Sequence, residues 1–513
     1  MRTPIGAVLA LVAMLALSAQ HSNAQVLFGS MVGNVTDASG AAVPGAHVKI
    51  TATGTNEVRN ADTNEAGNYT ISTVTAGTYQ VEIAKTGFRG FVTNNILVNQ
   101  NNVVRVDAQL QVGQQSEMVE VTAEAAALQT DRADVHAEVA AQQFEALPQP
   151  NRSYEGLLAL VPGTTPPGGQ LSGGTNNPSK SMQFSFNGTG VSAATVRIEG
   201  VSAMNPWVTN YTTFVPSIEA IQNVNVATSA ADAEQGLSGG ASVNVSLKSG
   251  SNQTHGAAFG YNIIAKFEAN NFFANAAGIP KPPHLVNNNT GGSLGGHVIK
   301  DKLFYFGSYE GDYANQADSG VLSIPAATQL RGDFTGSANE IYDPTTGAAN
   351  GTGRNPFPGK LIPASRVNPI TAKMLQYFPA TNLPGVNNNY YLNRPTVYNL
   401  HKIDTKVDYT ASQKLRLSGR WGYQPYYNFQ APIYGEFLGG SGGFPQSGAG
   451  NYLQNGATLA ISGSGTYVFS PSFVVDATFG ITQAHQLLFP NKTNERVGSD
   501  TLGIPGTNKG LLP

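Results

Sequence analysis

The sequence predicts a mainly β protein with three parts: an N-terminal β-sandwich, an α+β domain and an antiparallel transmembrane β-barrel. The 58 glycines and 29 prolines among 513 residues disfavour long helices and favour strands and turns. Only 12% of residues are charged, about half the ~25% of an ordinary soluble domain. This low fraction indicates that part of the protein surface contacts a non-aqueous environment. Long stretches of strict alternation between apolar and polar residues fill the C-terminal half, as expected for barrel strands.

The N-terminus carries an export signal. A positive start at residues 1–3 precedes an uncharged apolar run over 5–17, and small residues then lead to a cleavage site between Ala24 and Gln25. Residues 1–24 are therefore predicted to be a signal peptide. The run is too short to span a bilayer, which needs ~20 residues, and we find no longer one downstream. Any membrane contact of the exported chain must then be made by a β-barrel.

The composition and motifs disfavour several classes of function. A net charge of −3 provides no field for nucleic acid, and the absence of cysteine excludes disulfides, thiolate metal sites and cysteine nucleophiles. The eight histidines form no His-x-x-x-His pair, so no metal site is predicted. Gly-x-Ser-x-Gly matches at 236–240 and 439–443 lack the strand–turn–helix context of a nucleophile elbow. We expect no enzyme activity, cofactor, metal or nucleic-acid partner.

Residues 25–112 are predicted to form the sandwich, because short alternating strands are separated by turn signals. The segments 67–71 and 77–83, followed by Gly87 and Phe88, give a more specific layout. This layout resembles the carboxypeptidase-regulatory-like domain. The resemblance implies a seven-stranded sandwich that serves as a non-catalytic accessory.

Residues 113–253 read as a compact α+β region. A short extended piece lies at 117–123, and helices are predicted over 137–147 and 153–161, each closed by a proline. Glycine-rich loops and further strands follow, up to about residue 250.

Residues 254–513 show barrel-like strands and asymmetric connections. Short turns are expected at 410–413 and 470–472, whereas the links 314–400 and 424–455 are long. Outer-membrane barrels combine short periplasmic turns with long extracellular loops. The alternation predicts which side chains face lipid (Leu415, Leu417, Trp421, Tyr423) and which face the lumen (Arg416, Arg420). A soluble sandwich with one buried face would give the same alternation and is the alternative for this region.

Four segments carry a resemblance to a known family, and the order of the predicted regions extends it over the whole chain. Residues 197–201, 218–224 and 239–250 are similar to strands of the plug domain of TonB-dependent outer-membrane receptors, and 295–311 is similar to their early barrel strands. The order of signal, sandwich, plug and barrel is that of the Oar-type subgroup. The resemblance implies a plug at 113–253, a barrel from 254, and a location in the outer membrane with lipid around the barrel.

The same resemblance implies a function. Such receptors bind an extracellular ligand, unidentified here, with long loops and import it when a TonB-type energy-transducing protein moves the plug. The segment matching a TonB box comprises Val119, Glu120, Val121, Thr122 and Ala123, and an exposed extended segment suits strand addition by a partner. The alternatives are that 119–122 is simply the first plug strand, and that the protein is a surface adhesion or matrix-binding protein without active transport.

The strand count departs from the family. A plugged transporter barrel has ~22 strands, whereas residues 254–513 leave room for only about eight to ten strands of ~10 residues. The sequence is therefore expected to be truncated within the barrel and to form an open, curved half-barrel.

Overall fold

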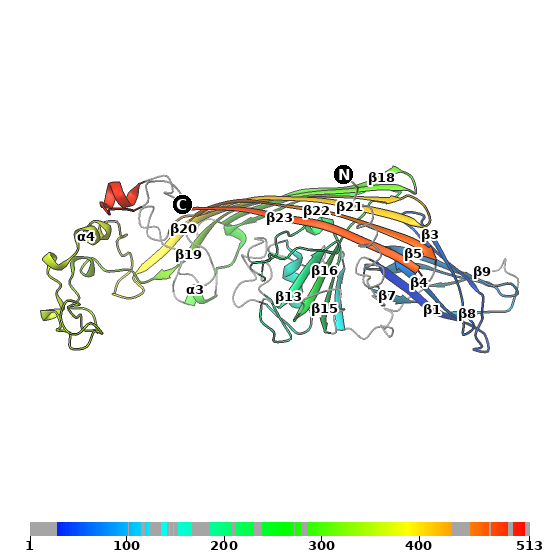
Figure 1. Cartoon of the computed structure of the whole chain (residues 1–513), viewed down its shortest axis with the longest axis horizontal. Helices are drawn as coiled ribbons and strands as arrows, with labels where there is room; N and C mark the ends of the chain where they lie inside the picture. Colours follow the sequence, from blue (N-terminus) through cyan, green and yellow to red (C-terminus); the bar gives the residue numbers. More distant parts are fainter. Residues whose placement is uncertain are drawn as a thin grey trace, which may run out of the picture.

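The computed structural model contains three β-rich bodies: a long sheet, a smaller body beneath it and a sandwich near one end of the sheet (Figure 1). It describes residues 28–507 except for 114–117, 123–134, 167–183, 230–238, 433–451 and 491–495, most of 141–151, and several runs of one to three residues. The predicted signal peptide and its cleavage site at Ala24 and Gln25 lie outside the described residues. Within the described part, no helix combines the length and apolar character needed to cross a membrane.

The N-terminal body is a two-sheet sandwich. One sheet has the order β4-β1-β7, with β8 also paired to β1, and the other has the order β3-β2-β5-β6-β9. Because β7 and β8 pair with successive parts of β1, they act as one interrupted strand, which gives the expected seven strands before β9. The strands are β1 (Gly29–Asp37), β2 (His47–Ala52), β3 (Val58–Asp62), β4 (Asn68–Val74), β5 (Gly77–Ala84), β6 (Gly90–Val98), β7 (Val103–Arg105), β8 (Ala108–Leu110) and β9 (Met118–Thr122).

The middle body, which we call the inner domain, is built on a five-stranded sheet with the order β10-β15-β16-β13-β14. A 3-10 helix packs on this sheet, and a two-stranded ribbon of β11 and β12 lies beside it. The elements are β10 (Val135–Ala140), η1 (Tyr154–Leu160), β11 (Thr164–Thr165), β12 (Ser185–Phe186), β13 (Ala194–Ile198), β14 (Val201–Ser202), η3 (Ile218–Ala220), β15 (Ile221–Ser229) and β16 (Ala241–Leu247).

The helix prediction over 137–147 is wrong at residues 137–140. Residues 135–140 form strand β10, which pairs antiparallel with β15, because Val135, Ala137 and Val139 alternate with polar residues. Residue 147 still donates a helical bond to the carbonyl of residue 143. The second prediction is confirmed as a 3-10 helix, with Ser153 as its N-cap.

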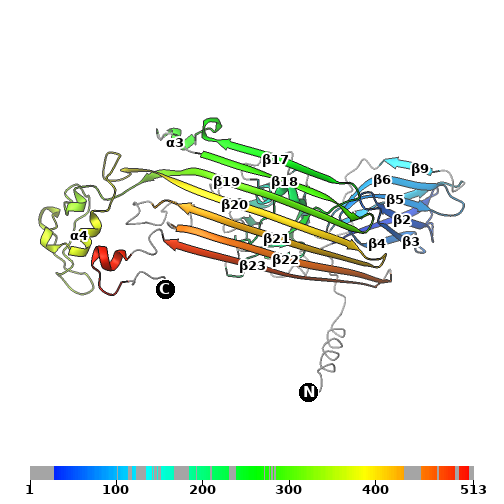
Figure 2. The same ribbon diagram turned by 90° about the horizontal axis from the view of Figure 1, so that it is seen from above.

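The C-terminal body is a seven-stranded antiparallel sheet, which we call the wall. Its strands follow chain order from β17 to β23, and the two end strands do not pair, so the sheet is open and curved (Figures 1 and 2). The expected open half-barrel is thereby confirmed. The strands are β17 (His255–Ile264), β18 (Leu285–Ile299), β19 (Leu303–Leu322), β20 (Tyr390–Thr410), β21 (Leu415–Gln430), β22 (Tyr452–Ser470) and β23 (Phe473–Pro490).

Seven strands are described, where eight to ten were expected, because six of them run for 15–21 residues rather than about ten. The two long links therefore shrink to 323–389 and 431–451. The first link contains four short helices, η6 (Gln329–Arg331), η7 (Pro358–Lys360), η8 (Ala364–Arg366) and α4 (Pro369–Leu375). The remaining helical elements are η5 (Ala265–Phe267), α3 (Phe272–Ala276) and η9 (Val497–Leu502).

The two faces of the wall differ as predicted. Leu417 and Trp421 are exposed on the convex face, whereas Arg420 is only 6% exposed on the concave face. The short turns lie at the end of the wall nearest the sandwich, and the long links extend from the opposite end (Figure 2). The inner domain lies under the concave face.

Candidate functional site

The candidate site is the interface between the inner domain and the concave face of the wall. One continuous apolar core spans it, because Phe306 on β19 and Ala460 on β22 belong to the same buried cluster as the inner-domain strands and η1. Around this core, charged and amide side chains are buried in a chain that has few charges. Buried charges are retained only where they are paired, so each one reports a specific contact.

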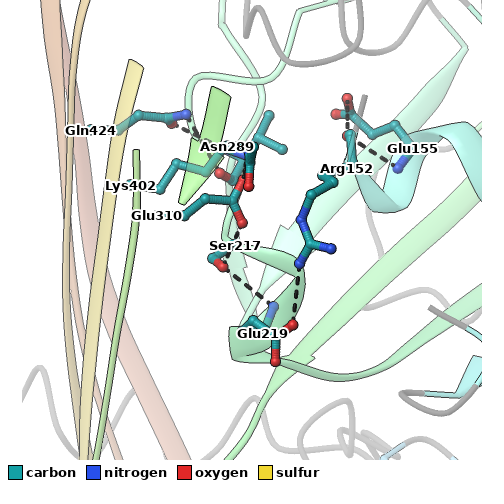
Figure 3. A network of polar contacts seen from close by, with 10 residues as sticks. Arg152, Glu155, Ser217, Glu219, Asn289, Glu310, Lys402 and Gln424 are labelled. Carbon is teal, nitrogen blue, oxygen red and sulfur yellow. Dashed lines mark hydrogen bonds and ion pairs between the residues drawn. The ribbon is translucent and has the colours of Figure 1, made fainter. Parts of the chain in front are cut away.

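The centre of the site is an ion pair within the wall (Figure 3). Glu310 on β19 and Lys402 on β20 are direct register partners, and Lys402 Nζ lies 3.0 Å from Glu310 Oε1 with both side chains fully buried. Asn289 Nδ2 on β18 donates to the same oxygen at 3.1 Å. The hydroxyl of Ser217 reaches across from the inner domain and donates to Glu310 Oε2 at 2.8 Å. One carboxylate thus joins three wall strands to the inner domain.

Ser217 owes its position to the start of η3, whose N-cap it forms. The next acidic residue, Glu219, pairs with Arg152 at 3.1 Å inside the inner domain. The Arg152 guanidinium also lies over the rings of Phe259 and Tyr261 on β17, at 4.4 and 4.2 Å from their centroids. These cation–π contacts hold the inner domain against the first strand of the wall.

A second wall pair lies nearer the sandwich. Arg420 on β21 donates to Asp404 on β20, with Nη2 at 2.7 Å from Oδ1, and its guanidinium also lies 4.7 Å from the ring centroid of Phe214 in the inner domain. Gln424 forms hydrogen bonds in both directions with the backbone of Val215, accepting at 3.0 Å and donating at 3.5 Å.

Glu199 forms an ion pair across the interface. Glu199 sits in the turn between β13 and β14 with a φ of 50°, which few non-glycine residues adopt. Its Oε2 lies 2.9 Å from Lys406 Nζ on β20, and its Oε1 accepts from the backbone N–H of Leu247 at 2.6 Å. Lys406 also donates to the carbonyl of Leu247 at 3.3 Å. An ion pair and a hydrogen bond to a backbone carbonyl therefore join the edge of the inner-domain sheet to the wall.

A close approach to the last strand completes the interface. A Cβ built on Gly480 of β23 would come within 2.3–3.0 Å of the Val201 side chain, so only glycine lets β14 approach this strand. Thr482 donates to the carbonyl of Ser202 at 3.3 Å beside it.

The pairing pattern has a mechanical consequence. Glu310–Lys402 and Asp404–Arg420 lie within the wall, and Arg152–Glu219 lies within the inner domain. When the two bodies separate, these charges keep their ion-pair partners. The Glu199–Lys406 pair, the cation–π contacts of Arg152 and Arg420, and hydrogen bonds such as that of Ser217 to Glu310 must break. Breaking a buried pair is costly, so keeping most pairs on one side lowers the free energy of separation. The interface is therefore tightly packed, and most of the ion pairs described above lie within one body or the other.

The sandwich is joined to the short-turn end of the wall by polar contacts. Arg416 forms an ion pair with Glu57, and Asp301 accepts from Asn56 at 3.1 Å and from Asn252 at 2.7 Å. Ser246 of the inner domain donates to Gln100 of the sandwich. All three bodies thus meet at the end of the wall that carries the short turns.

The predicted TonB-box residues lie away from the interface core. Val119, Glu120, Val121 and Thr122 form most of β9, which pairs in parallel with β6 of the sandwich, and Ala123 lies outside the described residues. Of the lumen-facing residues predicted from the alternation, Arg420 joins the site and Arg416 joins the sandwich contact. The described residues contain no group of three or more potential metal-binding side chains.

Comparison with known proteins assigns the wall to a family. Residues 246–512, more than half of the chain, match the outer membrane beta barrel domain, and residues 30–111 match the carboxypeptidase regulatory-like domain. The chain belongs to the outer membrane beta barrel family. It resides in the outer membrane.

Relatives of this barrel protein include known transporters. It is 26% identical over 329 residues to the TonB-dependent transporter Oar of Myxococcus xanthus, a match that covers 62% of this chain and 29% of that protein. The chain thus spans less than a third of the length of this relative. Among solved structures, a mutant ferric enterobactin receptor from Pseudomonas aeruginosa has a TM-score of 0.39 at 13% identity, covering 70% of this chain and 42% of that one. The outer membrane transporter YddB from Escherichia coli has a TM-score of 0.34 at 13% identity, covering 68% and 48%.

Sequence reasoning did not single out Glu310, Lys402 or Glu199 as partners. The sequence did contain a signal for these residues. In a chain with only 12% charged residues, charges at inward positions of barrel strands stand out as candidates for buried pairs. The pairing itself depends on strand register, which alternation alone does not fix.

Proposed function

We propose that this protein is a TonB-dependent outer-membrane transporter in which the inner domain is the plug. The observation that carries the proposal is the distribution of charge at the interface, where most buried charges are neutralised by partners on their own side. A plug that must move benefits from this arrangement, because its displacement leaves few charges unpaired. The similarity to Oar supports the same function.

The direction of transport follows from the ends of the wall. The long links and their short helices lie at the end opposite the sandwich, where outer-membrane barrels carry their extracellular loops. These loops would bind the ligand, and the sandwich end would face the periplasm. A TonB-type protein would then pair with residues 119–123 by strand addition and pull on the chain that leads into the plug.

The test is deletion of residues 119–123 at the chromosomal locus. A growth screen of a knockout strain on glycans, peptides and metal chelates first identifies a nutrient that depends on the gene. We expect the deletion to abolish uptake of that nutrient and to leave its binding to the cell surface intact. A matched deletion of residues 38–42, which are all exposed in the connection between β1 and β2 of the sandwich, controls for nonspecific damage.

Undiminished uptake by the 119–123 deletion strain would contradict energy coupling through this segment. Surface binding without any gene-dependent uptake, in the parent as well as in the deletion strain, would instead identify an adhesion or matrix-binding protein.

A further inference from the structure

The free edge of the sandwich is covered by the TonB-box-like segment. The second sheet has the order β3-β2-β5-β6-β9, so β9 is the terminal strand of that sheet. The pairing of β9 with β6 is parallel and runs over five consecutive register pairs, from Gly90 with Met118 to Asn94 with Thr122. A strand that pairs along one edge leaves the backbone groups of its other edge without a ladder partner.

We propose that the sandwich is a docking platform that presents β9 as an edge strand, to which a strand of the TonB-type partner adds while β9 stays on β6. This inference rests on the proposed function and adds to it the surface on which the partner binds. The partner is an extended periplasmic strand, which would become the next strand of the sheet after β9. In this account the accessory sandwich has a specific task, because it holds the segment in the conformation that the partner requires.

The physical argument is preorganisation. A free segment loses conformational entropy when a partner orders it, and this loss weakens binding. Pairing with β6 fixes β9 as a strand before the partner arrives. The composition of Met118–Thr122 suits this role, because valine and threonine favour strands and a single charged residue limits nonspecific association of an open edge.

Strand β9 is held by the sandwich body, and the sandwich contacts the wall and the inner domain through polar side chains. Phe91 on β6 is part of the buried sandwich core, so the strand that carries β9 is well anchored. The sandwich meets the wall and the inner domain through polar contacts such as Asn56 with Asp301 and Ser246 with Gln100. Force applied at β9 would therefore reach the sandwich and the plug together.

The test uses an engineered disulfide. Because the sequence contains no cysteine, the introduced pair has no competing thiols in the chain. Val92 and Glu120 are register partners, so the pair Val92→Cys with Glu120→Cys should form a disulfide in isolated outer membranes. The pair Val92→Cys with Met118→Cys is out of register and should crosslink less. A second variant lacks residues 26–112 and keeps residues 113–123.

The readout is binding of the purified periplasmic domain of TonB to these membranes, with the 119–123 deletion as the negative control. We expect the oxidised pair to bind at least as tightly as its reduced form, and removal of the sandwich to weaken binding at least about ten-fold. Three results would each overturn the platform: failure of the in-register disulfide, loss of binding on oxidation, or unchanged or tighter binding without the sandwich. If the parent membranes bind no TonB domain although the disulfide forms, the proposed function itself fails.

Discussion

The sandwich and the inner domain are both small β-rich bodies, but they are stabilised differently. Among the residues that the structure describes, the buried core of the sandwich draws only on residues 31–110, so it closes on itself. The core of the inner domain extends into the wall through Phe306 and Ala460, and buried ion pairs surround it. The sandwich is therefore a self-sufficient domain, whereas the stability of the inner domain depends in part on the wall.

This difference suits the two proposed roles. A platform that receives force should remain folded when it is pulled, and a plug should yield at its contacts with the wall. Cooperative units of different stability within one chain allow one part to move while another stays intact. Perturbing the wall contacts should therefore affect the inner domain alone, and perturbing the sandwich core should affect the sandwich alone.

The largest effect is expected from Glu310→Ala. It leaves Lys402 buried without its carboxylate, which typically costs about 3–5 kcal/mol. The chain has two tryptophans, Trp207 in the inner domain and Trp421 in the wall, so tryptophan fluorescence in denaturant reports on these bodies and not on the sandwich. Glu340→Ala, in an exposed loop pair with Lys360, is the control and should leave the transition unchanged. An unchanged transition in the Glu310 variant would show that the pair does not stabilise the interface.

The next largest effect is expected from Gly480→Ala. The new methyl group would overlap the side chain of Val201 and push β14 away from β23, at a cost of about 1–3 kcal/mol. Gly463→Ala on the neighbouring strand is the matched control, because the nearest atom to its Cβ is a carbonyl oxygen at 3.8 Å. Faster proteolysis of the inner domain in the first variant only is the expected result. Equal proteolysis of the two variants would contradict the close contact.

Tyr69→Phe should affect the sandwich alone and by about 1 kcal/mol, because it removes the bond that the buried hydroxyl donates to Val106 O at 2.7 Å. Burial raises the pKa of Tyr69 above its ordinary value of 10. The unfolded chain therefore loses this proton before the folded one does, and the sandwich should lose stability as the pH rises through 10. Urea unfolding of residues 26–112 at pH 8 and pH 11 measures both effects. A parent whose alkaline loss equals that of the Phe variant would contradict the assignment.

The smallest effect is expected from Asp301→Ala, which removes the acceptor for Asn56 and Asn252 at an exposed turn. Such surface changes usually stay within about 0.5 kcal/mol. Both the sandwich transition and the tryptophan transition should keep their midpoints. A large shift in the sandwich transition would mean that the sandwich depends on the wall after all.

Much of the architecture was predictable because it rests on short-range patterns. The alternation in 402–423 predicted the two faces of the wall, since side chains on a strand alternate regardless of what lies on either side. Turn residues predicted both tight hairpins. The prediction failed at 137–140, where alanine and glutamate favour a helix but pairing with β15 imposes a strand. Tertiary pairing overrode local propensity there.

The site was only partly predictable for a related reason. The inward position of Arg420 could be inferred from alternation, but its partner Asp404 lies on another strand, and the contact of Glu199 with Lys406 joins segments separated by some 200 positions. Such contacts depend on register and on the docking of two bodies. The role of 119–122 as a strand paired with β6 was equally hidden, because nothing in its local sequence specifies its partner.

The most direct test of the central claim compares two fragments in urea. Residues 26–112 and residues 113–253, each purified alone, are followed by circular dichroism. The account predicts a cooperative unfolding transition for the first fragment and none for the second, because the core of the inner domain is incomplete without the wall. A cooperative transition in residues 113–253 of the same size as that of the sandwich would contradict it.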